Sequence, residues 1–304
     1  MDFYKQLDFI MKQDFGNRGL LSSLPENPAE EAANTLRYAK RVIILTGFPV
    51  RLQDGSFIGE TDGPSGTANL AATLIAIGCR VDVVTDSASY DLLHAALLYR
   101  APKATLTLLP SGNTDAFIKN FISTIEPTHF ISLECPGKAC DGHYHNMYGA
   151  IIDDIVTDSA LFLSEAHLSG AVTISIGDGG NEMGMGTYRK EIIDCVSSGE
   201  LICAKESSDI VLASGVSNWW GWGISAILSC ILNRNFLPSA AEETELLKRV
   251  VAAGGVDGCT AQNELTVDHL SLDTHLSVLE KVSTLTSECL LKETTKKHPL
   301  QRFY

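Results

Sequence analysis

Carboxylates stand among glycines in the stretch ISIGDGGNEMGMG (residues 174–186), directly behind a run of apolar, strand-forming residues. The glycines let the backbone turn sharply and approach a ligand closely. Asp178 and Glu182 flank that turn, and Asn181 adds an amide oxygen. A phosphate cradle would need neutral or cationic partners, whereas acidic oxygens at one turn favour a hard divalent cation. A cation site is therefore expected here, and a plain glycine turn with exposed acids is the alternative.

Two further segments place carboxylates where a strand is expected to end. In ETDGPSG (60–66), Glu60 and Asp62 are two residues apart, so an extended backbone would present both on one side. Asp62 is equally suited to cap the helix that follows. In ECPGKACDG (134–142), Glu134 comes directly after a strand-like run, and Lys138 and Asp141 follow a Pro-Gly turn. Solvated turn charges are the alternative for this loop.

Loop histidines and the start of a helix add further candidates. His143 and His145 are two residues apart and could both face a metal, although ordinary loop histidines are more frequent. In SNWWGWG (217–223), Ser217 and Asn218 are suited to cap the next helix and to offer side-chain hydrogen bonds to a ligand. The three tryptophans of this segment suit a pocket wall, but core packing is the more frequent outcome.

The sequence lacks the common phosphate-binding and catalytic signatures. It contains no G-x-x-x-x-G-K-[ST], no H-E-x-x-H and no G-x-S-x-G, and in GDGGNEMG the third glycine of a dinucleotide fingerprint is replaced by Glu182. Residues 254–270 repeat the glycine-plus-acid composition with Asp257 and Asp268, but no pattern places them in the fold. We expect metal-assisted chemistry on a small substrate. Oxygen-only ligands favour Mg²⁺ or Mn²⁺ over zinc.

The apolar pattern predicts a scaffold that would bring these loops together. Strands that alternate with helices indicate an α/β fold: a doubly wound, mostly parallel sheet of about six or more strands, with helices on both faces and extra terminal helices. Runs rich in Val, Ile, Leu and Thr predict strands at 41–47, 80–85, 104–109, 129–134, 171–177 and 209–214. Helical spacing predicts helices at 65–78, 89–101, 115–123, 150–168, 218–235, 240–255 and 272–293.

We expect a single α/β domain over residues 1–304. Within it, we expect an N-terminal helical extension at residues 1–40, the core sheet and helices at 41–235, and a C-terminal helical addition at 236–304. Ligands of open α/β sheets bind beyond the carboxyl ends of the strands, where the strand order reverses. The acidic loops are therefore expected to meet at that edge.

Charge and cysteine usage limit the partners and the compartment. A net charge of −14 would repel phosphates, so nucleic-acid binding is not expected. No apolar run is long enough to cross a membrane. The 8 cysteines include no C-x-x-C pair and lie mostly in apolar runs, so we expect buried free thiols in a reducing, cytoplasmic compartment. The sequence leaves open whether the chain forms a homo-oligomer.

Four segments in the same order resemble the D-glutamate cyclase-like family. Its domain is the C-terminal catalytic part of D-glutamate cyclase and also occurs as a stand-alone prokaryotic-type protein. The segments are GFPV…ETDGPSGTANLAATL, ECPGK…DGHYHNMYG, ISIGDGGNEMGMG and VLASGVSNWWG. The resemblance covers roughly residues 35–270. It departs from the family pattern at Cys135, where a basic residue often stands.

The resemblance implies a metal-dependent lyase that converts D-glutamate to 5-oxo-D-proline and water, with an acidic amino acid as the small-molecule partner. It also implies a divalent metal held by acidic residues. The positions of this chain that match the family pattern are Glu60, Asp62, Glu134, Asp141, Asp178, Asn181 and Glu182.

Specific roles are expected for the residues of these loops. The metal ligands are expected to be Glu60, Glu134, Asp178 and Glu182, with Glu134 acting as ligand or general base. The catalytic set is expected to be Glu134, Asp178 and Lys138, and the substrate-binding set Asp62, Asp141, Ser217 and Asn218. Lys138 is expected to bind the α-carboxylate of the substrate.

Two other functions fit the same acidic loops. One is a metal-dependent phosphohydrolase acting on a small phosphorylated acid. The other is a non-catalytic small-molecule-binding module. Neighbouring buried carboxylates are costly unless a cation is present, which argues against the binding module.

Overall fold

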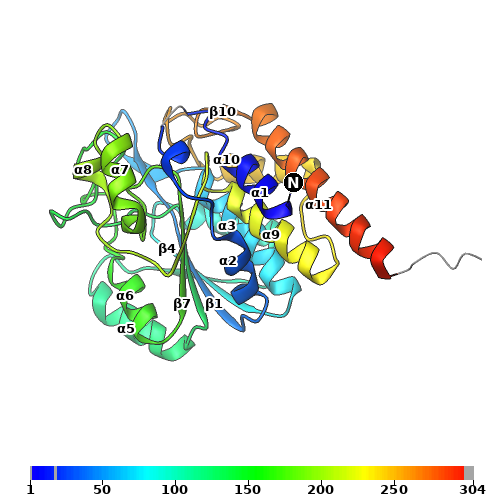
Figure 1. Ribbon diagram of the computed structural model, residues 1–304. Coiled ribbons are helices and arrows are strands. Elements are labelled where there is room, and N and C mark those ends of the chain that lie inside the picture. Colours follow the sequence, from blue (N-terminus) through cyan, green and yellow to red (C-terminus); the bar gives the residue numbers. More distant parts are fainter. Residues whose placement is uncertain (1, 17–18, 298–304) are drawn as a thin grey trace, which may run out of the picture.

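A six-stranded sheet with the order β5-β4-β1-β6-β7-β8 forms the centre of the molecule (Figure 1). We describe it from a computed structural model, which covers residues 2–16 and 19–297. All neighbouring strands in this sheet run parallel, which confirms the predicted fold class. The strands are β1 (Arg41–Thr46), β4 (Arg80–Thr85), β5 (Thr105–Leu108), β6 (His129–Leu133), β7 (Val172–Gly177) and β8 (Ile210–Ala213).

Helices follow the strands, as the alternating pattern predicts, and short antiparallel hairpins lie in two of the connections. The hairpins are β2 (Pro49–Arg51) with β3 (Phe57–Gly59), and β9 (Thr266–Val267) with β10 (Leu270–Ser271). The α-helices are α1 (Phe3–Met11), α2 (Ala29–Leu36), α3 (Asp62–Ala76), α4 (Tyr90–Arg100), α5 (Thr114–Ile125), α6 (Leu161–Leu168), α7 (Arg189–Cys195), α8 (Gly199–Ile202), α9 (Trp219–Leu232), α10 (Ala240–Ala252) and α11 (Leu272–Lys297).

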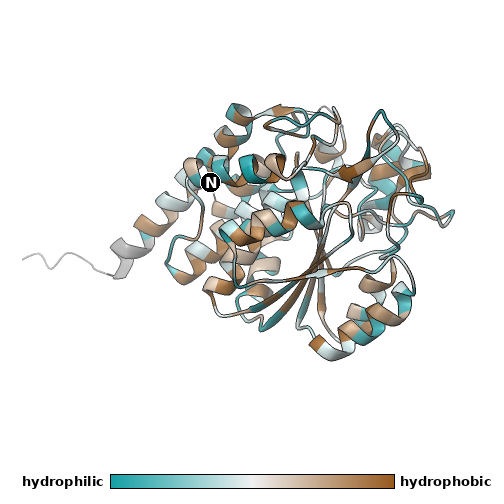
Figure 2. Cartoon of the chain, turned by 180° about the vertical axis from the view of Figure 1, so that it is seen from behind, coloured by the Kyte–Doolittle hydropathy of each residue, from teal (hydrophilic) through white to brown (hydrophobic). Residues whose placement is uncertain are grey.

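Successive strand residues supply two separate cores, one on each face of the sheet. Val42 and Ile44 of β1 belong to the larger core, which they share with α3, α4 and α9 and with the terminal helices. Ile43 and Leu45 belong to the core under α5 and α6 on the opposite face. Figure 2 shows that the helices around the sheet carry both hydrophilic and hydrophobic residues. Burial on both faces explains why β1 is apolar along most of its length rather than alternating between apolar and polar residues.

The terminal helices extend the larger layer of the fold. Helices α1 and α2 at the N-terminus and α11 at the C-terminus all contact α9. Helix α10 begins with a capping box in which the side chains of Ser239 and Glu242 hydrogen-bond to each other's backbone N–H. Such a box satisfies two of the donors that every helix start leaves open. Among the residues described, no helix combines the length and the apolar character needed to cross a membrane.

The helix predicted over 150–168 is correct only in its second half. Residues 150–160 form turns instead, and α6 begins at Leu161. Asp153 accepts a hydrogen bond from the backbone of Tyr144, and Asp158 accepts one from the backbone of Ala160. Aspartate side chains that bond nearby N–H groups compete with helix formation, which explains the difference.

The cysteines are free thiols, but not all of them are buried. Cys79, Cys135 and Cys203 lie in the interior, whereas Cys140 and Cys259 are exposed. Burial raises the pKa of the Cys79 thiol to about 11, so this side chain stays protonated at neutral pH. The expectation of buried thiols therefore holds only in part.

Candidate active site

The strand order reverses between β1 and β6, which are neighbours at the centre of the sheet. From β1 the chain continues outward through β4 and β5, then returns to β6 and continues outward through β7 and β8 on the other side. The connections after β1 and β6 therefore leave in opposite directions, which makes the carboxyl ends of these strands the topological switch point of the sheet. Ligands of doubly wound sheets bind at such a point.

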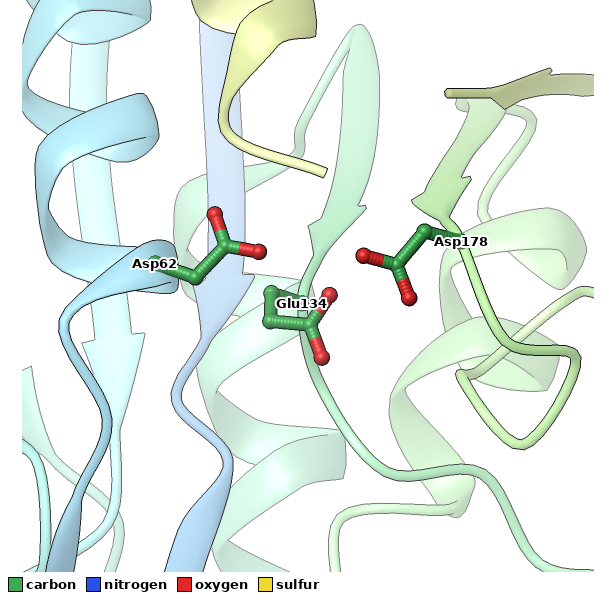
Figure 3. A group of neighbouring side chains, drawn as sticks. All are labelled: Asp62, Glu134 and Asp178. Atoms are coloured by element: carbon green, nitrogen blue, oxygen red, sulfur yellow. The ribbon is translucent and has the colours of Figure 1, made fainter. Parts of the chain in front are cut away.

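Three buried carboxylates meet at this switch point, one from each of the connections that follow β1, β6 and β7. Asp62 is the first residue of α3, Glu134 directly follows β6, and Asp178 directly follows β7. Each side chain offers an oxygen, and these oxygens lie within 4.8 Å of one another. Figure 3 shows the three carboxylates pointing toward a common centre. The residues are only 2%, 6% and 4% exposed, so their charges are largely removed from water.

Glu134 has a strained backbone that its neighbours hold in place. Its φ of 43° lies in the left-handed region, which is unfavourable for residues other than glycine. Its N–H donates to the carbonyl of Ile176 in β7 at 3.2 Å, and its carbonyl accepts from Gly47 N, just beyond β1, at 3.0 Å. Such strain costs about 1–3 kcal/mol and persists only where surrounding structure imposes it. The two adjoining strand ends thus fix the direction of the Glu134 side chain.

Glu182 organises the glycine loop that presents Asp178. Its Oε1 accepts hydrogen bonds from the backbone N–H groups of Asp178 (3.0 Å) and Gly179 (2.7 Å), and its Oε2 accepts one from Gly180 (2.7 Å). A Cβ at Gly177 would lie 2.8 Å from the carboxyl carbon of Glu182, so glycine leaves room for this closure. The predicted metal ligand Glu182 therefore faces its own loop and lies outside the group of three converging carboxylates.

The start of α9 contacts the start of α3 through Asn218. The backbone N–H of Asn218 donates to Asp62 Oδ1 at 2.7 Å, and its side chain donates to Ser65 Oγ at 2.8 Å. The helices approach closely because a Cβ at Gly66 would be 2.7 Å from the Asn218 Cα. Ser217 Oγ and Asn218 Oδ1 are buried, and neither has a hydrogen-bond partner within the described residues. Both therefore retain hydrogen-bonding capacity beside the carboxylates.

Glu60 is a fourth buried acid at this site. It is 7% exposed and lies next to Glu134, Asp62 and Asp268. Burial, followed by the charges of Glu134, Asp268 and Asp62, raises the pKa of Glu60 well above its usual value. Like charges in a desolvated site disfavour ionisation unless a cation offsets them.

The loop after β6 places its other predicted residues in local pairs. Lys138 forms an ion pair with Asp158 and lies over the ring of Tyr144. The exposed Asp141 pairs with Nε2 of His145 at 2.9 Å. The roles expected for Lys138 and Asp141 in substrate binding remain predictions.

The histidines of this loop and the tryptophans of α9 are engaged elsewhere. His143 pairs with Asp153 at 2.6 Å, so both candidate histidines contact aspartates of their own loop. Trp219, Trp220 and Trp222 are fully buried in the larger core, which favours the packing interpretation over a pocket wall.

The segment 254–270, which the sequence pattern did not place, lies against Glu60. Thr61 donates its backbone N–H to Val256 O at 2.9 Å and its side-chain hydroxyl to Thr266 O at 2.9 Å. The glycines and acids of this segment resemble those of the other loops. Hydrophobic periodicity nevertheless does not show that it contacts Glu60 and Thr61, which are distant in the sequence.

Comparison with known proteins identifies the family. The chain matches the family described as D-glutamate cyclase-like, C-terminal, over residues 7–283. It is also 26% identical over 319 residues to "D-glutamate cyclase, mitochondrial" of Homo sapiens. That match covers 93% of this chain but 52% of the human protein, so the chain spans about half the length of that relative. The chain belongs to the D-glutamate cyclase-like, C-terminal family, as the four acidic and glycine-rich segments suggested.

Proposed function

We propose that this chain is a metal-dependent lyase of the D-glutamate cyclase type, which converts D-glutamate to 5-oxo-D-proline and water. The observation that carries the proposal is the meeting of Asp62, Glu134 and Asp178 at the edge of the sheet where the strand order reverses. Membership of the D-glutamate cyclase-like family and the similarity to the human D-glutamate cyclase support the proposed reaction.

The donor set at this group of carboxylates fits a hard divalent cation. All three converging ligands are carboxylates, and oxygen donors suit Mg²⁺ or Mn²⁺. Three buried like charges at this separation are costly unless a cation offsets them. We assign Asp62, Glu134 and Asp178 as the ligands, with Asp62 in the place that the sequence pattern had given to Glu182. When bound, the ion would withdraw charge from the γ-carboxylate of the substrate.

Cyclisation requires the α-nitrogen of glutamate to bond to its own γ-carboxyl carbon. The carbon–nitrogen bond forms, one carbon–oxygen bond breaks, and the departing oxygen leaves as water with two protons from the ammonium group. The nitrogen must lose a proton before it can attack, so a nearby carboxylate has to accept it. We assign this role to Glu60, a buried acid that lies beside Glu134 and is not one of the three converging ligands.

Substrate orientation is assigned to the start of α9. Ser217 and Asn218 lie beside Asp62, are almost fully buried and have side-chain oxygens with hydrogen-bonding capacity left. Contacts from these residues would hold the substrate curled, so that its amine and γ-carboxylate meet. Fixing two reacting groups in this way supplies much of the rate enhancement of an intramolecular reaction.

The test is incubation of the purified chain with D-glutamate or L-glutamate and with Mn²⁺, Mg²⁺ or excess EDTA, followed by chiral chromatography for 5-oxoproline. We expect 5-oxo-D-proline only from the D-isomer and only with metal. Product formation that is unaffected by EDTA would refute metal dependence. Absence of product from either isomer, together with phosphate release from small phosphorylated acids, would instead support the phosphohydrolase.

A further inference from the structure

A short antiparallel contact brings two cysteines together beside the glycine loop of the candidate active site. Ala139, in the loop after β6, pairs with Ala204, two positions after the end of α8. In an antiparallel pair, the residue that follows one partner lies opposite the residue that precedes the other. The register therefore places Cys140 opposite Cys203, with both side chains on the same face of the contact.

The spacing of this pair suits a disulfide bond. The backbone N–H of Lys205 donates to the carbonyl of Lys138 at 2.7 Å, which holds the two segments together one position away. Residues directly opposite each other in an antiparallel pair have Cα atoms about 4.5–5.5 Å apart. The Cα atoms of disulfide-bonded cysteines are usually about 4.4–6.8 Å apart. The charge of Cys140 also affects the pKa of Cys203, which shows that the two thiols are close.

The two thiols differ in their access to solvent. Cys140 is exposed, whereas Cys203 is fully buried. Burial raises the pKa of the Cys203 thiol to about 11, and the positive charge of Arg189 acts in the opposite direction. An exposed thiol can react with an external oxidant, and a neighbouring thiol can then displace the group that was added. Cys140 is therefore suited to meet an oxidant and Cys203 to resolve the intermediate.

We propose that Cys140 and Cys203 form a reversible disulfide, with a low-molecular-weight disulfide as the oxidant. The Cys140 thiolate attacks one sulfur of the oxidant, whose sulfur–sulfur bond breaks and releases one thiol. The sulfur of Cys203 then attacks that of Cys140, the mixed disulfide breaks, and a second thiol leaves. Both cysteine protons end on the released thiols, so two cysteines are oxidised and one external disulfide is reduced. The inference does not depend on the metal site proposed above.

The disulfide would brace the glycine loop that presents Asp178. Gly137, in the loop after β6, donates its N–H to Asn181 O at 2.9 Å, and Ala204 donates its N–H to Gly180 O at 3.0 Å. The two segments that carry the cysteines therefore both hydrogen-bond to the glycine loop. A covalent link between these segments opposes their local separation. We expect slower amide hydrogen exchange at Gly137 and Ala204 in the oxidised protein.

The test is incubation of the folded full chain with glutathione disulfide until no further thiol is lost, followed by alkylation of the remaining thiols and peptide mass spectrometry. We expect a crosslink between Cys140 and Cys203 that dithiothreitol reverses, while the buried Cys79 and Cys135 remain free thiols. Cys140→Ser should abolish this crosslink. Cys259→Ser is the matched control, since it removes another exposed thiol and should leave the crosslink intact.

Three outcomes would overturn the disulfide. The first is a glutathione adduct on Cys140 next to a free Cys203 thiol, and the second is two free thiols at these positions in a chain whose Cys259 carries glutathione. The third is a crosslink that forms only when Cys79 is modified as well, because the reaction would then require unfolding. Equal hydrogen exchange in the reduced and oxidised forms would overturn the brace on the glycine loop.

Discussion

Asn218 and Asp62 join the starts of α9 and α3 by a 2.7 Å hydrogen bond from the Asn218 backbone to Asp62 Oδ1. The residues are separated by 156 positions in the chain. One oxygen of Asp62 is thus positioned by the backbone of another helix, while the carboxylate as a whole faces Glu134 and Asp178 (Figure 3). The packing of two helices therefore sets the position of a candidate metal ligand.

Gly66→Ala should disrupt this relationship. The new Cβ would lie 2.7 Å from the Asn218 Cα, so α3 and α9 would have to separate. Overpacking of this kind costs about 1–3 kcal/mol, and we expect a lower melting temperature together with weaker Mn²⁺ binding. Thermal unfolding with and without Mn²⁺ measures both effects. Gly112→Ala is the control because its Cβ would meet no atom within 4 Å; equal effects of the two substitutions would contradict the prediction.

Glu182→Gln should loosen the glycine loop without removing a ligand. The carboxylate accepts three backbone N–H groups, and a glutamine amide would turn a donor toward one of them. An unsatisfied buried donor costs about 1–3 kcal/mol. We expect faster amide hydrogen exchange at Gly179 and Gly180 and weaker Mn²⁺ binding. Unaltered exchange combined with a complete loss of the ion would instead identify Glu182 as a direct ligand.

Asp178→Asn should have opposite effects on the metal-free and metal-loaded forms. Removing one charge from a buried cluster of like charges stabilises the metal-free fold, since ionised acids there repel one another. The variant should lose the rise in melting temperature that Mn²⁺ gives the parent chain. We also expect activity to fall by about 100-fold or more. Normal stabilisation by Mn²⁺ in this variant would exclude Asp178 as a required ligand.

Asp86→Asn should change how stability depends on pH. Burial is the main cause that raises the pKa of Asp86 from 3.8 to about 6. Its protonated form is therefore favoured in the folded state. This contribution to stability is fully present below pH 3.8 and is lost as the pH rises through about 6. The loss amounts to about 3 kcal/mol for a shift of this size.

The asparagine variant isolates this contribution. Its side-chain oxygen can still accept the backbone N–H groups of Ala88 and Ser89, as Asp86 Oδ1 does at 3.0 and 3.3 Å. The measurement is the free energy of unfolding in urea between pH 4 and pH 8, for the parent chain and the variant. We expect the difference between them to favour the variant increasingly as the pH rises. If the two profiles of unfolding free energy against pH were parallel, the pKa of Asp86 would be the same in the folded and the unfolded state.

The sequence by itself determined the sheet, because its signal is local. Runs such as 41–47 and 171–177 are apolar along their length, and the structure places β1 and β7 within them. The same local reasoning located Glu134 and Asp178 at strand ends, since a strand's end follows from where its apolar run stops. The same reasoning predicted a helix that begins before Leu161, which is wrong. Asp158 accepts a hydrogen bond from the backbone N–H of Ala160, which competes with helix formation, and the spacing of hydrophobic residues does not reveal such a bond.

Only the tertiary structure decided which acids share a centre. Asp62, Glu134 and Asp178 meet because the strands that precede them, β1, β6 and β7, are neighbours where the strand order reverses. Glu182 turns to its own loop, where its carboxylate accepts three backbone N–H groups. Asp268 reaches Glu60 from 208 positions away through a hairpin whose pairing no local pattern encodes. Contacts between residues that are distant in the sequence depend on how the helices and strands pack against one another, and no single segment determines that packing.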